Sequence, residues 1–159
     1  MHISSIKDLP SEKITDFLIK HWGSPKMVIS SGVYDCSKLE GFIVLNEENN
    51  IAGLITYVIK DNECEIISLD SVEEGKGIGT ALLKAVEDVA KENNCKVLKL
   101  ITTNDNLLAL RFYQKRGYYF SKLLLNAVEK ARRVKPEIPL IGNDGIPIRD
   151  EILLEKLVR

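Results

Sequence analysis

Hydrophobic residues recur along the first half of the chain in short runs that polar turns separate. After a helix-like opening segment at residues 11–22, the stretch 26–69 contains four strand candidates rich in Val, Ile, Tyr and Thr. The turns EENN at 47–50 and DN at 61–62 divide the last three candidates. Strand candidates separated by short polar turns are typical of an antiparallel meander. The first half of the chain is therefore predicted to be mostly sheet.

The hydrophobic period changes in the second half. Apolar side chains recur every three or four residues after a glycine-rich turn, which predicts an amphipathic helix up to about Asn93. The run KVLKLITT at 96–103 is nearly continuous in apolar residues, as expected for a strand buried on both faces, and its place after a helix predicts a right-handed parallel crossover. A second helix is expected to begin near Asn104 or Asp105 and to end at Gly117.

The sequence of the last third of the chain predicts a strand, a helix, a loop and a final segment. These are YYFSKLLL, NAVEKARR, KPEIPLIGNDGIP and IRDEILLEKLV. The final segment fits an edge strand or a short helix, and we favour the strand. Three prolines make the tail rigid, so residues 126–159 are expected to form a structured lid or brace and the last strand. The predicted fold class is α+β, with a mixed, mostly antiparallel central sheet flanked by helices and one parallel β-α-β unit.

Composition narrows the class of protein. The 159 residues fit one domain spanning 1–159, and the formal net charge of -1 with 28% charged residues gives no reason to expect a nucleic-acid partner. Three widely spaced cysteines without a CxxC motif predict neither disulfides nor a metal site, and favour a reducing cytoplasm. No apolar run approaches the roughly 18 residues of a membrane span, and no apolar signal core opens the chain. A cytoplasmic protein without a membrane partner is expected.

The glycine-rich turn EGKGIGTALL at 74–83 is the strongest chemical signal. Gly75, Gly77 and Gly79 alternate between a strand and a helix. Such a turn exposes backbone N–H groups at the positive end of the helix dipole, where a phosphate binds. The chain has no GxxxxGK[ST] motif, and Thr80 stands where a dinucleotide fingerprint needs glycine. Another nucleotide-bearing cofactor is therefore favoured over a simple tight turn.

The segments GKGIGTALL and NLLALRFYQKRGY together resemble the GNAT superfamily of N-acetyltransferases, whose motifs are [QR]xxGx[GA] and NxxAxxxYxxxG[FY]. The first motif matches at Gly77 and Gly79, with Glu74 where Gln or Arg is usual. The second matches at every fixed position: Asn106, Ala109, Tyr113, Gly117 and Tyr118. The resemblance covers about residues 63–120, which would form the cofactor-binding core.

The resemblance implies acetyl-CoA as cosubstrate, with its pyrophosphate on the glycine turn and its pantetheine between the strands that flank the long helix. The backbone of Leu69 would donate to the thioester carbonyl. Lys76 would either add charge to the phosphates or be a solvated loop lysine, and Asn106 would contact the cofactor or only cap its helix. The carboxylate of Glu74 would repel the pyrophosphate unless it turns outward. The implied cofactor residues are Leu69, Glu74, Gly75, Lys76, Gly77, Ile78, Gly79, Thr80, Asn106 and Tyr113.

Acetyl transfer to an amine needs a base for the ammonium proton and an acid for the leaving thiolate. By resemblance Tyr113 is the acid, against the alternative that it only packs in the core. Strand alternation places Glu63, Glu65, Ile67 and Leu69 on one face. We expect Glu65 to be the base, with Glu63 second, against the alternative that this face is open to solvent.

The acceptor side is the least defined. Trp22, Tyr34 and Asp35 either line an amine pocket or anchor loops. The predicted activity is direct acetyl transfer from acetyl-CoA to a primary amine of a small molecule or peptide. The alternatives are a non-catalytic CoA-binding sensor or assembly module, and transfer to a hydroxyl or of a longer acyl group. A monomer or a homodimer is expected, and the homodimer would pair through an edge strand near Ile152.

Overall fold

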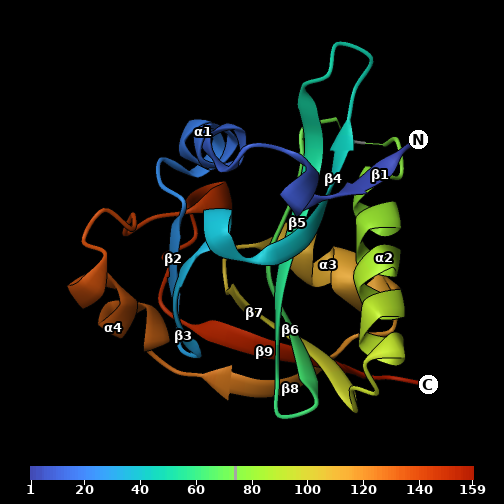
Figure 1. The fold of residues 1–159 in the computed structure, drawn as a ribbon. Helices are drawn as coiled ribbons and strands as arrows, with labels where there is room; N and C mark the ends of the chain where they lie inside the picture. Colours follow the sequence, from blue (N-terminus) through green and yellow to red (C-terminus); the bar gives the residue numbers. More distant parts are fainter. Residues whose placement is uncertain (74) are drawn as a thin grey trace. The chain divides into compact units, whose positions relative to one another are not determined.

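A computed structural model of the chain describes residues 1–73 and 75–159 (Figure 1). The contacts within the chain divide it into two compact units. Unit 1 comprises Met1–Met27, Tyr34–Leu98 and Val158–Arg159, and unit 2 comprises Val28–Val33 and Lys99–Leu157. The elements are β1 (Ile3–Ser5), η1 (Ile6–Asp8), α1 (Ser11–Trp22), β2 (Lys26–Ile29), β3 (Gly32–Asp35), η2 (Cys36–Lys38), β4 (Glu40–Leu45), β5 (Ile51–Lys60), β6 (Glu63–Ser71), α2 (Ile78–Glu92), β7 (Val97–Thr103), α3 (Leu107–Lys115), β8 (Tyr119–Leu124), α4 (Ala127–Val134), η3 (Asn143–Gly145) and β9 (Glu151–Leu157).

Unit 1 is built on the predicted antiparallel meander. Its strands are paired in the order β1-β4-β5-β6, and each of these pairs is antiparallel. The hairpin of β5 and β6 turns at Asp61 and Asn62, both with positive φ angles (53° and 63°). Asn and Asp tolerate this left-handed conformation better than other residues with side chains, which is why a DN turn suits a tight hairpin.

Helix α2 packs against β4, β5 and β6 in unit 1 (Figure 1). Its predicted apolar stripe is the buried face, where Leu82 and Val86 are fully buried. Helix α1 packs against η2 and buries Ile14 and Leu18. Burial of each such side chain stabilises the fold by about 1.5–3 kcal/mol. The predicted bounds of α1 and the predicted end of α2 are confirmed.

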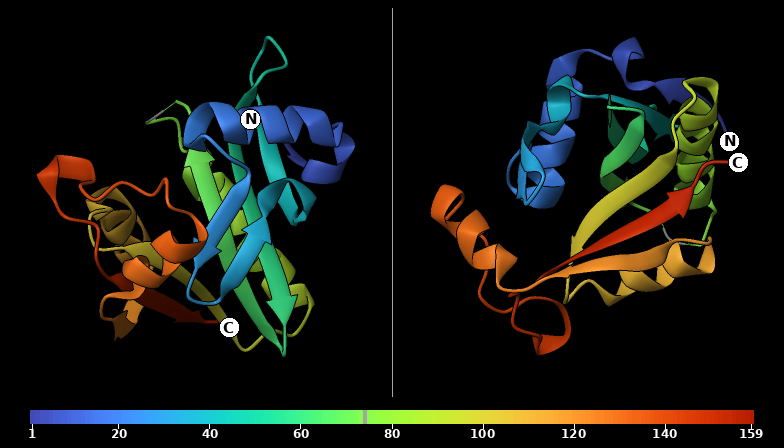
Figure 2. Two further views of the ribbon diagram at one scale, coloured as in Figure 1. Left: turned by 90° about the vertical axis from the view of Figure 1, so that its left-hand side faces the viewer. Right: turned by 90° about the horizontal axis from the view of Figure 1, so that it is seen from below.

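Two features of the first half of the chain differ from the sequence prediction. The stretch 26–69 holds five strands instead of four, because its first part folds into β2 and β3, which pair only with each other (Figure 2, left). The strand β1 was not predicted, since its three residues are too few to show a period. It pairs with β4 through the register Ile3↔Val44.

The C-terminal strands of unit 2 pair in the order β7-β9-β8. Figure 2 (right) shows β8 and β9 side by side, and they are antiparallel through pairs such as Tyr119↔Glu155. The prediction of a final strand is confirmed, but the prediction that it is an edge strand is wrong. β9 lies between β7 and β8 and buries Glu151 and Leu154, whereas β8 is the edge and is largely exposed. A homodimer contact through an edge near Ile152 is therefore not available.

Helix α3 ends as predicted, because Gly117 follows it with φ +93°. It begins at Leu107, later than the predicted start near Asn104 or Asp105, and Asn106 is its N-cap. The two expected caps instead bind residues of the chain's C-terminal part. Helix α4 forms where the pattern NAVEKARR predicted it.

The fold class is the predicted mixed α+β class, and the strand pairs within each unit are mostly antiparallel. The assignment of residues 1–159 to one domain stays a prediction. In the part of the chain that the structure describes, no helix is both long and apolar enough to cross a membrane.

Candidate active site

A bulge in β6 decides which side chains share a face of the unit 1 sheet. Thr56 pairs with Ser68 but the next residue, Tyr57, pairs with Ile66, so Ile67 is an extra residue. A bulge of this kind shifts the phase of the side chains by one position. Beyond Ile67, the even-numbered residues of β6 therefore lie on the face that the odd-numbered residues occupied before it.

This phase shift corrects the predicted face of β6. Glu63 and Glu65 share a face, as expected, because they pair with Lys60 and Val58 of β5. Leu69, however, pairs with Ile55 and lies on the opposite face. The residues that join the two glutamates on their face are Ser68 and Asp70.

Asp70 is the polar residue at the end of this face, and Trp22 is its partner. Trp22 Nε1 donates a 2.9 Å hydrogen bond to Asp70 Oδ1. Asp70 Oδ2 is buried and has no hydrogen-bond partner among the described residues. Burial raises the pKa of Asp70 to about 6, although the Trp22 hydrogen bond and the charge of His21 act to lower it. A buried, half-satisfied carboxylate is characteristic of functional sites.

A buried polar cluster lies one step back along the same face. The hydroxyls of Thr56 and Ser68 form a 2.5 Å hydrogen bond. Cys36 of η2 contacts both hydroxyls, and burial raises the pKa of its thiol to about 11. The thiol is therefore neutral at physiological pH and is not an activated nucleophile. The cluster packs η2 onto the strand that presents Asp70.

The two predicted glutamates differ in exposure. Glu65 is only 7% exposed, whereas Glu63 is half-buried at the start of β6. Both residues interact with other residues of the chain. They share the face of Asp70 through the register of β5 and β6. The structure thus places three carboxylates along one strand face.

The glycine turn precedes α2 in unit 1. Gly75 and Gly77 have φ angles of +78° and +72°, and a Cβ at either position would meet no atom within 4 Å. Gly77 is the N-cap of α2 and provides no side-chain hydrogen bond to the first turn, which contains Ile78, Gly79 and Thr80. The first N–H groups of a helix have no intrahelical acceptor, so they favour an anion.

Lys76 in the turn forms a 2.8 Å salt bridge with Glu73. This contact raises the pKa of Lys76, and both side chains are exposed to solvent. Lys76 is therefore an exposed lysine with a local partner, and its contact with the cofactor stays a prediction. The predicted contact of Glu74 with the cofactor falls on a residue outside the described part of the chain.

Asn106 and Tyr113 belong to α3 in unit 2. Asn106 Oδ1 accepts from the N–H of Ala109, and its Nδ2 donates to Thr102 Oγ1 at 3.1 Å, so this side chain caps the helix. Tyr113 is 5% exposed and packs edge-on against Phe112 and Tyr118, at ring-centroid distances of 5.1 and 5.4 Å. Its ring is thus fixed in the core of unit 2.

The remaining predicted acceptor-side residues have structural contacts. Asp35 Oδ1 accepts from the N–H of Ser37 at 3.0 Å and from its hydroxyl, and so caps η2. Tyr34 is half-buried in β3 and interacts with other residues. Of the three candidates, Trp22 is the one that contacts an unsatisfied carboxylate.

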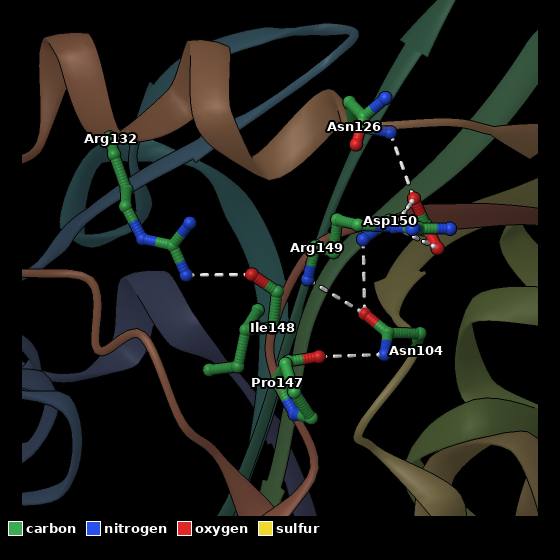
Figure 3. A network of polar contacts seen from close by, with 7 residues as sticks. All are labelled: Asn104, Asn126, Arg132, Pro147, Ile148, Arg149 and Asp150. Carbon is green, nitrogen blue, oxygen red and sulfur yellow. Dashed lines mark hydrogen bonds and ion pairs between the residues drawn. The ribbon is translucent and has the colours of Figure 1, made fainter.

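A polar network in unit 2 binds the C-terminal loop to the turn after β7 (Figure 3). Asn104 Oδ1 accepts from the N–H groups of Arg149 and Asp150, both at 3.0 Å, and Asn104 Nδ2 donates to Pro147 O at 2.9 Å. Arg132 Nη2 donates to Ile148 O at 2.7 Å.

Comparison with known proteins identifies the class to which these features belong. The model of the acetyltransferase (GNAT) family matches residues 11–118. The chain belongs to the GNAT family. The uncharacterized protein YxbD of Bacillus subtilis (strain 168) is 58% identical over 156 residues, which are 98% of each chain.

Two solved structures are similar to this GNAT protein. An IAA acetyltransferase from Bacillus cereus ATCC 14579 superposes with a TM-score of 0.75 at 21% identity, covering 98% of both chains, which shows the shared fold. A GNAT acetyltransferase from Elizabethkingia anophelis, with acetyl-CoA bound, has a TM-score of 0.66 at 27% identity over 77% of this chain and 78% of its own. Family membership supports acetyl transfer as the general class of activity. Among residues 1–73 and 75–159, no cluster of His, Cys, Asp and Glu is arranged to hold a metal ion.

Sequence reasoning missed Asp70, although the sequence contains a signal for it. Polar residues stand at 63, 65, 68 and 70 of β6. They keep a period of two only if one extra residue is inserted between 65 and 68, which is the definition of a bulge. The shifted period thus predicts both the bulge and the shared face of these four side chains.

Proposed function

We propose that this GNAT protein is an N-acetyltransferase that moves the acetyl group of acetyl-CoA to a primary amine by direct attack. The glycine turn carries the proposal. Gly75 and Gly77 hold left-handed φ angles with open space beside them, directly before the N-terminus of the 15-residue helix α2. Backbone N–H groups in such a turn suit a pyrophosphate. The acetyl-CoA bound to the Elizabethkingia anophelis neighbour supports the same cofactor here.

The residues present fit acetyl-CoA. Gly75, Gly77 and the first turn of α2 would hold the pyrophosphate, and the backbone of Leu69 would receive the thioester carbonyl, as the family resemblance implies. Lys76 would add charge only by leaving Glu73. Acetyl-CoA supplies the activated acyl carbon, and the protein supplies binding, orientation and proton transfer.

The transfer requires two proton steps. The acceptor ammonium must lose one proton before its nitrogen attacks, and the thiolate that leaves must gain one. We assign the second step to the phenol of Tyr113, on the basis of its place in the GNAT motif. The first step needs a carboxylate, and the face of β6 offers Glu63, Glu65 and Asp70.

The acceptor in this proposal is a primary amine of a small molecule or a peptide. A cytoplasmic location fits the three cysteines, all of which are free thiols and buried. Nucleic acids and membranes are not partners in this proposal, because the net charge is only -1. The protein acts as a monomer or as a homodimer that does not use β9 as an edge.

Calorimetric titration with acetyl-CoA tests the proposal, with NADH and ATP as control ligands. We expect selective binding in the micromolar range. Gly75→Ala should weaken the affinity for acetyl-CoA about 10-fold, which corresponds to about 1.4 kcal/mol. Gly145→Ala is the matched control, because Gly145 also has a left-handed φ (+73°) and open space, but lies outside the turn.

Two results would contradict the proposal. If acetyl-CoA does not bind, or binds no better than NADH and ATP, the cofactor assignment fails. If acetyl-CoA binds selectively but no amine yields free CoA, the protein is a non-catalytic CoA-binding module. Thiol release with alcohols would instead assign a hydroxyl acceptor, and thiol release with longer acyl-CoA donors would assign a longer acyl group.

A further inference from the structure

Among the described residues, Asp70 Oδ2 is the carboxylate oxygen of β6 that is buried without a hydrogen-bond partner. Glu63 and Glu65 lie on the same face but are engaged with other residues. An unsatisfied buried oxygen is unfavourable for folding, so a ligand that donates a hydrogen bond to Asp70 Oδ2 would stabilise this site.

Trp22 fixes the orientation of this carboxylate. Its indole N–H donates to Asp70 Oδ1 at 2.9 Å, so Oδ1 is satisfied and Oδ2 is left as the available acceptor. The two residues come from the end of α1 and the end of β6, and both belong to unit 1. Because β6 and α1 are regular elements, the geometry of the pair does not depend on a loop.

The other titratable groups that act on Asp70 are few. His21 lies beside Trp22 on α1, and its positive charge would favour the ionised carboxylate. Cys36 of η2 is a neutral thiol at physiological pH. Glu63 and Glu65 lie further back along the same strand face. Burial dominates over the Trp22 and His21 contributions and raises the pKa of Asp70 to about 6. Such a carboxylate is ionised at neutral pH and is a stronger base than an exposed one.

We propose that Asp70 Oδ2 is the proton acceptor for the amine substrate, that Trp22 positions it, and that the substrate therefore reaches this face as a cationic primary alkylammonium. The inference rests on the proposed function. Asp70 directly follows Leu69, whose backbone is the donor that the family resemblance assigns to the thioester carbonyl. The proton acceptor thus follows the proposed carbonyl donor in the chain.

The proposed reaction is balanced in atoms and charge. The ammonium donates one proton to Asp70 Oδ2, and the neutral nitrogen attacks the thioester carbon. The C–N bond forms and the C–S bond breaks. The second nitrogen proton leaves as the amide forms, the thiolate is protonated to CoA thiol, and one net proton passes from Asp70 to solvent.

The first test uses Trp22 as a reporter, because it is the only tryptophan in the chain. Its fluorescence should titrate with a midpoint near the Asp70 pKa of about 6. The transition should disappear in Asp70→Asn and persist in His21→Gln. If the transition persists in Asp70→Asn and disappears in His21→Gln, Trp22 reports the histidine and the geometry is refuted.

The second test uses n-butylammonium as the probe, at pH 7.5. We expect it to change Trp22 fluorescence in the native protein but not in Asp70→Asn, while the neutral isostere butan-1-ol has no effect. An equal response to both probes, or none to either, would overturn the cation site. Calorimetry with acetyl-CoA on the same samples separates the two proposals: retained acetyl-CoA binding with a failed Trp22 test removes only the Asp70 role.

The third test is the pH profile of kcat/KM, measured by thiol release with n-butylamine. The native profile should fall below about pH 6, with the pKa of Asp70. Asp70→Asn should lower kcat/KM by about 10²–10⁴-fold and abolish this limb.

Trp22→Phe should move the acidic limb of the profile to higher pH, because it removes a hydrogen bond that stabilises the ionised form of Asp70. Asp88→Asn, at an exposed site, is the control and should show the native pH profile. A limb that survives in Asp70→Asn and vanishes in Glu65→Gln would give the role to Glu65.

Discussion

Gly53 of β5 lies directly against Ile78, the first residue of α2: a Cβ on Gly53 would stand 2.4 Å from Ile78 Cγ2. It would also lie 3.2 Å from the carbonyl oxygen of Asp70 on β6. The missing side chain therefore allows the helix N-terminus to sit close to the strands, next to the glycine turn. A backbone glycine outside the motif thus positions the proposed pyrophosphate site.

We predict that Gly53→Ala displaces the first turn of α2. It should destabilise the fold by about 1–3 kcal/mol through overpacking and weaken acetyl-CoA binding. Thermal unfolding and calorimetry measure the two effects. Combining Gly53→Ala with Ile78→Ala removes the closest clash and should restore part of the affinity. Unchanged affinity in the single variant would show that the position of α2 does not depend on this contact.

Asp70 should make stability depend on pH. Its folded-state pKa, about 6, is raised from the usual 3.8. The native state therefore binds this proton more tightly than the unfolded state, and its stabilising effect is lost as pH rises from about 4 to about 6. Above that range the ionised, buried group destabilises the fold by about 3 kcal/mol.

Asp70→Asn removes this dependence, because an amide does not ionise. Relative to the native protein, the variant should gain up to about 3 kcal/mol in unfolding free energy between pH 4 and pH 7.5. Urea unfolding at the two pH values measures the difference. Asp88→Asn, at an exposed site on α2, is the control. A constant difference between native protein and Asp70→Asn would mean that Asp70 has an ordinary pKa.

The three cysteines should react slowly in the native protein. Burial raises the pKa of Cys36 to about 11 and that of Cys64 to about 12, and it also raises the pKa of Cys95. At pH 8 the thiolate fraction of Cys36 is about one part in a thousand. Titration with Ellman's reagent should show little reaction before denaturant is added. A fast stoichiometric reaction of one thiol would contradict these raised pKa values and would identify an activated cysteine.

Asn104 should hold the C-terminal loop in place. Asn104→Ala leaves the N–H groups of Arg149 and Asp150 without their acceptor, and each lost hydrogen bond costs about 0.5–1.5 kcal/mol. Hydrogen exchange at residues 146–150 should accelerate, while exchange in unit 1 stays unchanged. Gln114→Ala, which removes an exposed amide of α3, is the control. Equal exchange in both variants would mean that the network does not hold the loop.

Much of the fold could be predicted from local patterns. The 3.6-residue period identifies α2, and Gly117 marks the end of α3, because both depend on a few neighbouring residues. The hairpin of β2 and β3 and the short β1 could not be predicted, because their few residues show no period. Asn104 and Asp105 were expected to cap a helix, but their side chains bind the C-terminal loop instead, at Arg149 and Asn143. Long-range contacts of this kind are invisible to a local pattern.

In the candidate site, too, features set by local sequence could be predicted, and features set by long-range pairing could not. The glycine turn and the motif of Tyr113 are readable in the sequence. The face of Leu69 was predicted wrongly, because strict alternation ignored the bulge at Ile67. Asp70 was missed for the same reason, and its pairing with Trp22 joins residues 48 positions apart.

Thiol release from acetyl-CoA with a panel of primary amines tests the central claim most directly. The native protein should release CoA and form an acetylated amine that mass spectrometry detects, whereas the matched alcohols should give no product. Tyr113→Phe should lose about 10²–10⁴-fold in turnover while it keeps its affinity for acetyl-CoA. Tyr119→Phe, on the exposed face of β8, should match the native protein. Selective acetyl-CoA binding without any acetylated amine, or full turnover in Tyr113→Phe, would contradict the proposed mechanism.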